Sequence, residues 1–209
     1  MAFTYFFRDI HTLDLTVRHL APEVMGRSKI RIWDAGCAMG PEPYTLAILL
    51  AEHLGKFAFK NLCIQATDID ESNRFGEIIA AGDYPAREVK RMPRELLRKY
   101  FRPAGKPGYF RIIDEVRKRV VFQRHNLLSL EPVGNNFSLV LCKNVLLHFQ
   151  PRERVEVIRM FHQALAPRGF LATEQTQKIP GEVERLFQPI TGDAQLFRKV
   201  GARRCHGLT

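Results

Sequence analysis

Residues 29–52 read KIRIWDAGCAMGPEPYTLAILLAE and decide the fold of the chain. An alternating apolar run at 30–33 predicts a strand, and the helical spacing of the leucines at 46–50 predicts a helix. Gly36 and Gly40 lie between them, where the chain can turn tightly and a ligand can approach because glycine has no Cβ. In such strand, loop and helix units the ligand binds outside the carboxyl end of the strand. We therefore expect the main binding site over this loop.

The composition of the loop indicates which ligand it suits. Counted from Gly36, the second and third glycine positions of a dinucleotide-binding loop hold Ala38 and Pro41. Pro41 and Pro43 remove N–H donors that a phosphate would need, and Glu42 adds a negative charge. The loop therefore favours a ligand with an amino or other cationic group, such as S-adenosylmethionine (SAM). A tight turn that binds no ligand is the alternative.

The length and composition are those of one ordinary globular domain. The chain has 209 residues, of which 45% are hydrophobic and 10% aromatic, enough to bury a real core. No apolar run reaches the ~18 residues that a membrane-spanning helix needs. The first residues, MAFTYFFRD, lack the basic-then-apolar order of a signal peptide. We expect a cytoplasmic protein with no insertion into a membrane.

The charge of the chain bears on its partners. A formal charge of +10 and an isoelectric point near 9.8 favour acidic partners, either nucleic acid or a glutamate-rich protein segment. The cysteines at 37, 63, 142 and 205 form no C-x-x-C pair, so we expect reduced, mostly buried thiols and neither zinc nor disulfides.

Two further segments carry candidate site residues. An apolar strand at 62–66 ends in Asp68, and a carboxylate at that place can accept hydrogen bonds from both hydroxyls of a ribose. Asp70 is expected to cap a helix that begins near Glu71. The aromatic segment at 3–8 ends in Arg8, which can stack on a neighbouring ring or point its guanidinium at a carboxylate.

The remaining elements complete an alternating pattern. We expect helices at 72–81, 93–101 and 152–165, strands at 138–142 and 169–173, a small antiparallel hairpin of 109–113 with 120–122, and a closing hairpin of 187–190 with 195–200. The pattern predicts an α/β fold of the class I SAM-dependent methyltransferase, Rossmann-like type, with a mostly parallel sheet flanked by helices. It assigns 1–200 to this domain, about 105–124 to a small β subdomain and 201–209 to a basic tail. The basic residues at 111–124 are either a solvated face or a docking surface.

Five segments in order carry a resemblance to a known family. They are T-Y-F-F-R, D-A-G-C-A-M-G-P-E-P-Y-T-L-A, A-T-D-I-D, R-H-N-L-L and C-K-N-V-L-L-H-F, and together they span roughly residues 4–200. This combination resembles the CheR family of chemotaxis-receptor methyltransferases. The resemblance implies methyl transfer from SAM to glutamate side chains on the acidic signalling helices of a chemoreceptor. The products are glutamyl methyl esters and S-adenosylhomocysteine (SAH).

The resemblance also implies roles for single residues. It places Thr4 and Arg8 in the SAM pocket, with Arg8 near the transferring methyl, together with the loop residues Gly36 and Ala38. It assigns the methionine amino group to Glu42, the ribose to Asp68, the adenine edge to Asn126 and Leu127, and the wall beneath the sulfonium to Asn144 and Val145. Asn126 and Asn144 also have a simpler interpretation as caps of local backbone.

The sequence departs from the family pattern at several places. His148 stands where the family typically has Tyr near the reacting centre, so it is either a catalytic group or a satisfied core residue. Lys143 replaces the usual Arg, and Met39 lies where small residues are commoner. The family usually carries an N-terminal helical domain before T-x-F-F-R, and the sequence given has none. Two alternatives follow: a SAM-dependent enzyme acting on RNA or a small molecule, and a SAM-binding signalling module without turnover.

Overall fold

The computed structural model describes residues 4–176 and 178–201. Their main feature is a seven-stranded sheet in the order β6-β2-β1-β7-β8-β10-β9. The strands are β1 Ile30–Ala35, β2 Leu62–Asp68, β6 Val120–Arg124, β7 Phe137–Cys142, β8 Leu165–Thr173, β9 Phe187–Pro189 and β10 Leu196–Lys199. Neighbouring strands from β6 to β8 pair in parallel, and β10 pairs antiparallel with both β8 and β9. The expected α/β fold with a closing hairpin is confirmed.

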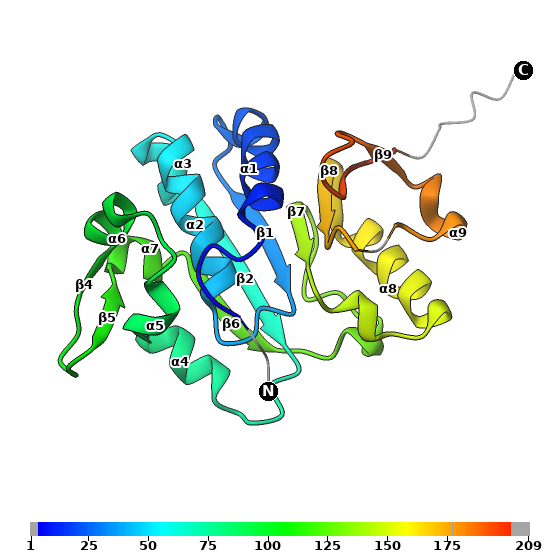
Figure 1. The fold of residues 1–209 in the computed structure, drawn as a ribbon. Helices are drawn as coiled ribbons and strands as arrows, with labels where there is room; N and C mark the ends of the chain where they lie inside the picture. The colour runs from blue at the N-terminus through cyan, green and yellow to red at the C-terminus, as the bar shows by residue number, and fades with distance from the viewer. Residues whose placement is uncertain (1–3, 177, 202–209) are drawn as a thin grey trace, which may run out of the picture.

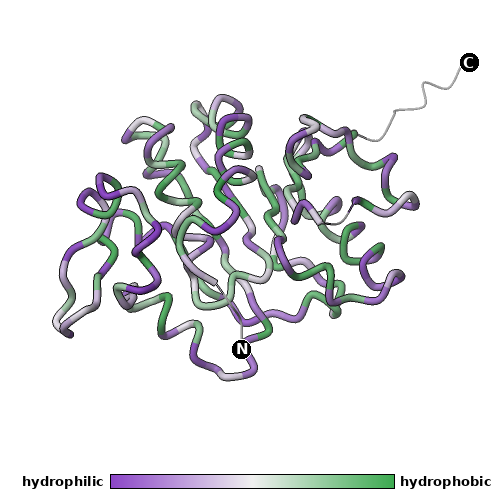
Figure 2. The backbone as a smooth tube through the Cα atoms, in the orientation of Figure 1, coloured by the Kyte–Doolittle hydropathy of each residue, from purple (hydrophilic) through white to green (hydrophobic). Residues whose placement is uncertain are grey.

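Helices cover both faces of this sheet (Figure 1). They are α1 Ile10–Val24, α2 Pro41–His53, α3 Lys56–Lys60, α4 Phe75–Ala81, α5 Ala86–Val89, α6 Arg94–Tyr100, α7 Asp114–Arg117, α8 Pro151–Ala164 and α9 Gly181–Glu184. One face carries α1 and α2, and the other carries α8. Figure 2 shows hydrophobic stretches along the inner strands and hydrophilic ones along much of the outer loops.

The alternation of side chains along β1 divides the core into two parts. Ile30 and Ile32 pack with the residues of α1 and α2, whereas Trp33 and Ala35 pack with those of α8. Successive residues of a strand point to opposite faces, so each face of β1 buries its own set. Because β1 is covered on both faces, its sequence is apolar at most positions. Arg31 and Asp34 are the exceptions, and the Asp34 side chain is fully buried.

The order of the strands places the binding crevice. From β1 the chain passes to β2 on one side of the sheet, and β7 pairs with β1 on the other side. The crossovers therefore leave β1 in opposite directions, which opens a crevice at the carboxyl ends of β1 and β7. The loop after β1 lies at this point, as the sequence predicts.

The expected hairpin of 109–113 with 120–122 is wrong. β5 Tyr109–Ile112 instead lies between β3 Asp83–Pro85 and β4 Phe101–Pro103 in a three-stranded antiparallel sheet. Helix α7 separates β5 from β6, and β6 pairs in parallel with β2. Pairing of β6 with β5 would join strands that are close in sequence. In the structure β6 instead pairs with the buried strand β2. The small sheet therefore comes from 83–112 rather than from 105–124.

Asp70 does not cap a helix at Glu71, because α4 begins at Phe75 and its N-cap residue is Arg74, but the Asp70 side chain still bonds the start of α4. Its carboxylate accepts the backbone N–H groups of Arg74 and Phe75, at 3.2 and 2.9 Å. These bonds satisfy donors that the first turn of a helix leaves unpaired.

Among the described cysteines, Cys37 and Cys142 are buried free thiols and Cys63 is an exposed one. Cys205 and most of the predicted basic tail lie outside the described residues. In the described part of the chain no helix is long and apolar enough to cross a membrane.

Candidate SAM-binding site

The loop after β1 is fastened to the end of β2. The backbone N–H groups of Gly36 and Cys37 donate to the carbonyl of Thr67, at 2.7 and 3.0 Å. The N–H of Ala38 donates to the Asp68 carboxylate at 2.9 Å. Gly36, Ala38 and Gly40 all have positive φ angles, of 99°, 48° and 100°. The glycines therefore supply backbone conformations that other residues adopt only with strain.

Gly36 is also needed because the opposite wall is close. A Cβ at Gly36 would lie 2.1 Å from Cγ2 of Val145. We expect Gly36→Ala to lower the free energy of unfolding by about 1–3 kcal/mol, since it combines a strained φ with overpacking. It should also weaken SAH binding, because relief of the clash displaces the wall of the site. Denaturant unfolding and SAH calorimetry measure the two effects.

Gly26→Ala is the matched control, because a Cβ at Gly26 meets no atom within 4 Å. Equal effects of the two substitutions on SAH binding would contradict the assignment of the loop to the site.

A cavity of about 500 Å³ lies over the loop. Its lining includes Thr4, Arg8, Glu42, Asn144, Val145 and His148, and also Gly36, Ala38 and Asp68. Segments far apart in the sequence thus meet at one place: the N-terminal segment, the β1 loop, the end of β2 and the end of β7. The volume is in the range of small-molecule and cofactor sites.

A second cavity of about 160 Å³ adjoins the first. It contains the remaining predicted residues, Asn126 and Leu127, and shares Gly36, Asp68 and Val145 with the larger cavity. Asn126 also fulfils the simpler interpretation, because its Oδ1 accepts the N–H of Leu128 at 3.0 Å and caps a short turn. Every predicted site residue therefore lies on one of two connected cavities.

Met39 of the β1 loop lies beside the site. It lines a neighbouring cavity of about 510 Å³ with Ile69 and Phe75, which touches the other two through Asp68. It is absent from the linings of the two cavities that hold the predicted residues.

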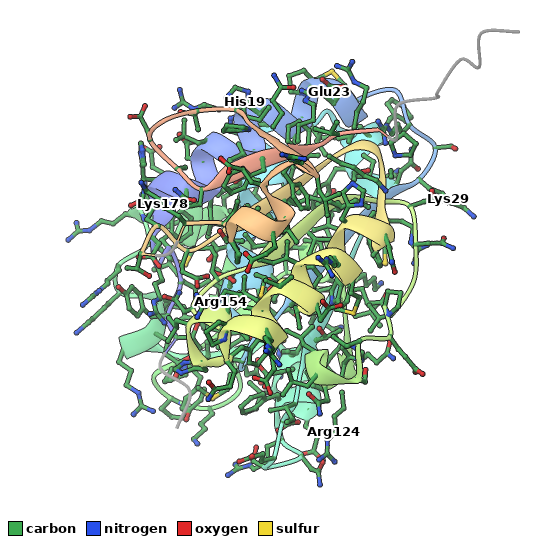
Figure 3. The ribbon with its side chains drawn as sticks, turned by 90° about the vertical axis from the view of Figure 1, so that its right-hand side faces the viewer. His19, Glu23, Lys29, Arg124, Arg154 and Lys178 are labelled. Carbon is green, nitrogen blue, oxygen red and sulfur yellow. The ribbon has the colours of Figure 1, made fainter. Side chains whose placement is uncertain are left out.

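Arg124 of β6, labelled in Figure 3, supports the chain that follows Asp68. Its guanidinium donates to the Ile69 carbonyl at 2.9 Å and to Asn73 Oδ1 at 2.8 Å. These two bonds fix the loop that directly follows Asp68, the carboxylate expected to bind the ribose.

Lys143 is the centre of the charges in the larger cavity. Its side chain is 1% exposed, and its Nζ lies 3.2 Å from the Glu42 carboxylate and 3.7 Å from that of Asp9. Burial raises the pKa of Glu42, although the Lys143 ammonium opposes this effect. The sequence showed Lys143 only as a departure from the family, and it gave no signal that Asp9 reaches the site.

Asp9 gathers the polar groups at the mouth of the cavity. Besides Lys143, its carboxylate lies 3.7 Å from Arg8 Nε, and it accepts a long hydrogen bond of 3.4 Å from the Asn144 amide. Asp9 stands at the N-cap of α1 but makes no capping bond there. Its carboxylate is therefore engaged with the site and not with the helix.

His148 is an exposed side chain on the turn after β7, and it lines the larger cavity. The turn is held from behind by Arg154 of α8, labelled in Figure 3. The Arg154 guanidinium donates to the carbonyls of Leu146 and Phe149, at 3.1 and 3.3 Å. The interpretation of His148 as a satisfied core residue is therefore wrong, since the chain turns its ring out of the core and toward the cavity.

In the described ranges 4–176 and 178–201, no group of His, Cys, Asp and Glu side chains is placed to hold a metal ion. The polar groups around the cavities include the carboxylates of Glu42 and Asp68, the amides of Asn126 and Asn144 and backbone groups, besides the cations of Arg8 and Lys143. The carboxylates and amides are the candidate groups for the ligand. These are suited to an ammonium group and to ribose hydroxyls.

The family can be assigned by comparison with known proteins. Residues 2–196 match the model of the CheR methyltransferase SAM-binding domain. The chain belongs to the CheR methyltransferase family. The matched part is the SAM-binding domain of that family, and SAM is its cofactor. The two connected cavities are the candidate SAM site of this CheR domain.

Individual relatives agree with this assignment. The chain is 32% identical over 173 residues to chemotaxis protein methyltransferase 2 of Vibrio cholerae, covering 80% of this chain and 59% of the relative. It is 31% identical over 188 residues to chemotaxis protein methyltransferase 1 of Pseudomonas aeruginosa, covering 85% and 67%. It is also 34% identical to an uncharacterised 104.1 kDa protein of Rhodobacter capsulatus, of which it covers 18%. The chain thus spans only part of the length of these relatives.

A solved structure supports the fold. A methyltransferase from Geobacter sulfurreducens is similar with a TM-score of 0.50 and 12% identity, over 89% of this chain and 79% of that one. At this identity the likeness concerns the fold alone.

Proposed function

We propose that the protein transfers the methyl group of SAM to glutamate side chains of a chemoreceptor-like protein, forming glutamyl methyl esters. The observation that carries the proposal is the meeting of Arg8, Glu42 and Asp68 on one cavity in a CheR-family domain. The two carboxylates suit a ligand with an ammonium group and a ribose. Arg8 suits an acceptor that is itself a carboxylate.

The residues of the cavity divide into a cofactor end and an acceptor end. In this proposal Glu42 binds the amino group of SAM, Asp68 binds the ribose hydroxyls, and Asn126 and Leu127 border the adenine. Val145 with Asn144 forms the wall beneath the sulfonium. Thr4, Gly36 and Ala38 complete the cofactor side.

Arg8 and His148 form the acceptor end. In this proposal Arg8 aims the acceptor carboxylate, and the exposed His148 side chain lines the same cavity. When bound, SAM supplies an activated methyl group on its sulfonium. The bond from sulfur to methyl breaks as the bond from carboxylate oxygen to methyl forms, so a carboxylate and a sulfonium become a neutral ester and a thioether.

This reaction needs positioning more than acid–base catalysis. The reference pKa of a glutamate is about 4.3, so the acceptor is already ionised near neutral pH. Holding the oxygen, methyl and sulfur in line and excluding water supplies the rate enhancement. The residues that hold the reacting groups are Gly36 and Val145 in the wall of the site, the mostly enclosed Glu42, and Arg8 with its guanidinium.

The test is methyl transfer from labelled SAM to a chemoreceptor signalling fragment. We expect label in the fragment that mild alkali releases as methanol, because glutamyl methyl esters hydrolyse easily. The charge of +10 favours RNA as the alternative acceptor. Alkali-stable methyl label in added RNA, with none in the fragment, would replace the proposal with that alternative. Absence of label in both, with SAH bound, would favour a signalling module without turnover.

A further inference from the structure

Three ionisable side chains meet at the cofactor end of the site: Asp34 and Lys143, which are buried, and Glu42, which is partly exposed to the cavity. Ile30 and Ile32 face α2, so the alternation along β1 turns the Asp34 side chain to the same face. Asp34 is in register with Leu141 of β7, which also packs in the core under α1 and α2. Lys143 follows Leu141 by one full alternation and therefore lies on this face too. There its ammonium contacts Glu42 of α2 at 3.2 Å.

The charges of this group do not balance. Asp34 is 0% exposed, and neither of its carboxylate oxygens has a hydrogen-bond partner among the described residues. Lys143 is in contact with the carboxylate of Glu42, whereas its charge acts on the carboxylate of Asp34 without a hydrogen bond or ion pair between them. A buried carboxylate without a donor is costly when ionised, so it holds a proton instead.

The groups around Asp34 reinforce this conclusion. Burial, followed by the charge of Glu42, raises the pKa of Asp34 well above its usual value, Lys143 opposes the rise, and Asp68 adds to it. The thiols of Cys37 and Cys142 on either side have raised pKa values, mainly through burial, and carry no charge near pH 7.

Two more carboxylates border the group. Asp9 lies 3.7 Å from Lys143 at the mouth of the cavity, and it is half exposed to solvent. Glu174, which follows β8, is buried, and its pKa is raised by burial. Because both are carboxylates, neither offsets a negative charge on Asp34. The groups around Asp34 therefore favour its protonated form.

We propose that binding of the ligand's ammonium group at Glu42 expels one proton from Asp34, and that the ionised Asp34 then becomes the second partner of Lys143. Before binding, one ammonium faces one ionised carboxylate. After binding, two ammonium groups, from Lys143 and the ligand, face the two carboxylates of Glu42 and Asp34. Counted over Lys143, Glu42, Asp34 and the ligand's ammonium, with the ligand's own carboxylate outside the group, the charges balance in both states, which is the condition for burying charges at low cost.

Lysine suits this exchange. Its ammonium is a compact charge with three donors on a flexible stem, so it can turn from one carboxylate to another. Asp34 does not touch the ligand in this arrangement, because its oxygens are buried behind the cavity. It is a positioning residue that acts through Lys143. The inference rests on SAM as cofactor and is independent of the methyl acceptor.

The decisive experiment is calorimetry of SAH binding at pH 6.5 in several buffers that differ in ionisation enthalpy. The ligand's amino group carries its proton at this pH. We expect about one proton to be released per SAH bound. Below neutrality the affinity for SAH should therefore increase by up to tenfold for each unit by which the pH is raised. Net proton release near zero, or proton uptake, would overturn the proposal on the wild-type protein alone.

Two comparisons assign the proton. 5′-Methylthioadenosine has the nucleoside but no amino group, so its binding should release no proton. Asp34→Asn should bind SAH more weakly, release no proton and lose the pH dependence. Release of about one proton by a folded Asp34→Asn variant would contradict the assignment to Asp34. Release of one proton with methylthioadenosine would show that the ammonium is not its cause.

Discussion

Asp68→Ala is expected to weaken SAH binding by about 100-fold or more. In the proposed site its carboxylate accepts two hydrogen bonds from the ribose, and hydrogen bonds to a charged group contribute about 1.5–3 kcal/mol each. The substitution also removes the acceptor of the Ala38 N–H, which lies 2.9 Å away. The β1 loop therefore loses one of its fastenings to β2. Calorimetric titration of SAH measures the loss.

Asp83→Asn is the control for this experiment. Asp83 is also a partly exposed carboxylate, paired with Arg111 at 2.6 Å, but it lies in the three-stranded sheet and lines none of the three cavities around Asp68. SAH affinity should be unchanged in it. Normal SAH affinity in Asp68→Ala would contradict the assignment of the ribose to this carboxylate. It would also contradict the proposed orientation of the cofactor.

Arg8→Ala is expected to reduce methyl transfer by about 100-fold or more at saturating SAM, because the acceptor carboxylate is no longer held in line with the methyl group. SAH affinity should fall by less than about tenfold, or 1.4 kcal/mol, since Glu42, Asp68 and the loop remain. Arg8→Lys should recover only part of the rate, as an ammonium lacks the planar fork of the guanidinium. Initial rates with labelled SAM and parallel SAH titrations separate the two effects.

Arg18→Ala provides the matched control. Arg18 is an exposed arginine of α1 that pairs with Asp14 at 2.8 Å. It should leave both rate and affinity unchanged. Equal loss of SAH affinity and of rate in Arg8→Ala would place Arg8 on the cofactor alone and leave the acceptor carboxylate without its proposed partner.

The parts of the fold that depend on neighbouring residues could be predicted from the sequence. The strand, loop and helix at 29–52 follow from local spacing. The pairing of β6 could not be predicted, because 120–124 fit a hairpin with 109–112 as well as a place beside β2. Only the assembled sheet decides between a local partner and a distant one.

The site shows the same division. Its lining residues could be found because short motifs carry them, and the fold brings all of them to two connected cavities. The charged groups behind the lining could not be found from the sequence. No sequence motif marks Asp34 and Lys143 as part of a charged group. Their burial depends on α2 and on two strands that are distant in sequence. Asp9 would be assigned from sequence as a helix cap, whereas its carboxylate faces Lys143, Arg8 and Asn144.

The most direct test of the proposed function is to locate the transferred methyl group. A chemoreceptor signalling fragment incubated with the protein and SAM should gain one methyl group on individual glutamate side chains, as found by mass spectrometry of its peptides. The gain should disappear after mild alkali and be absent with Arg8→Ala. Methyl groups on other side chains, or label that survives alkali, would contradict a glutamyl ester as the product.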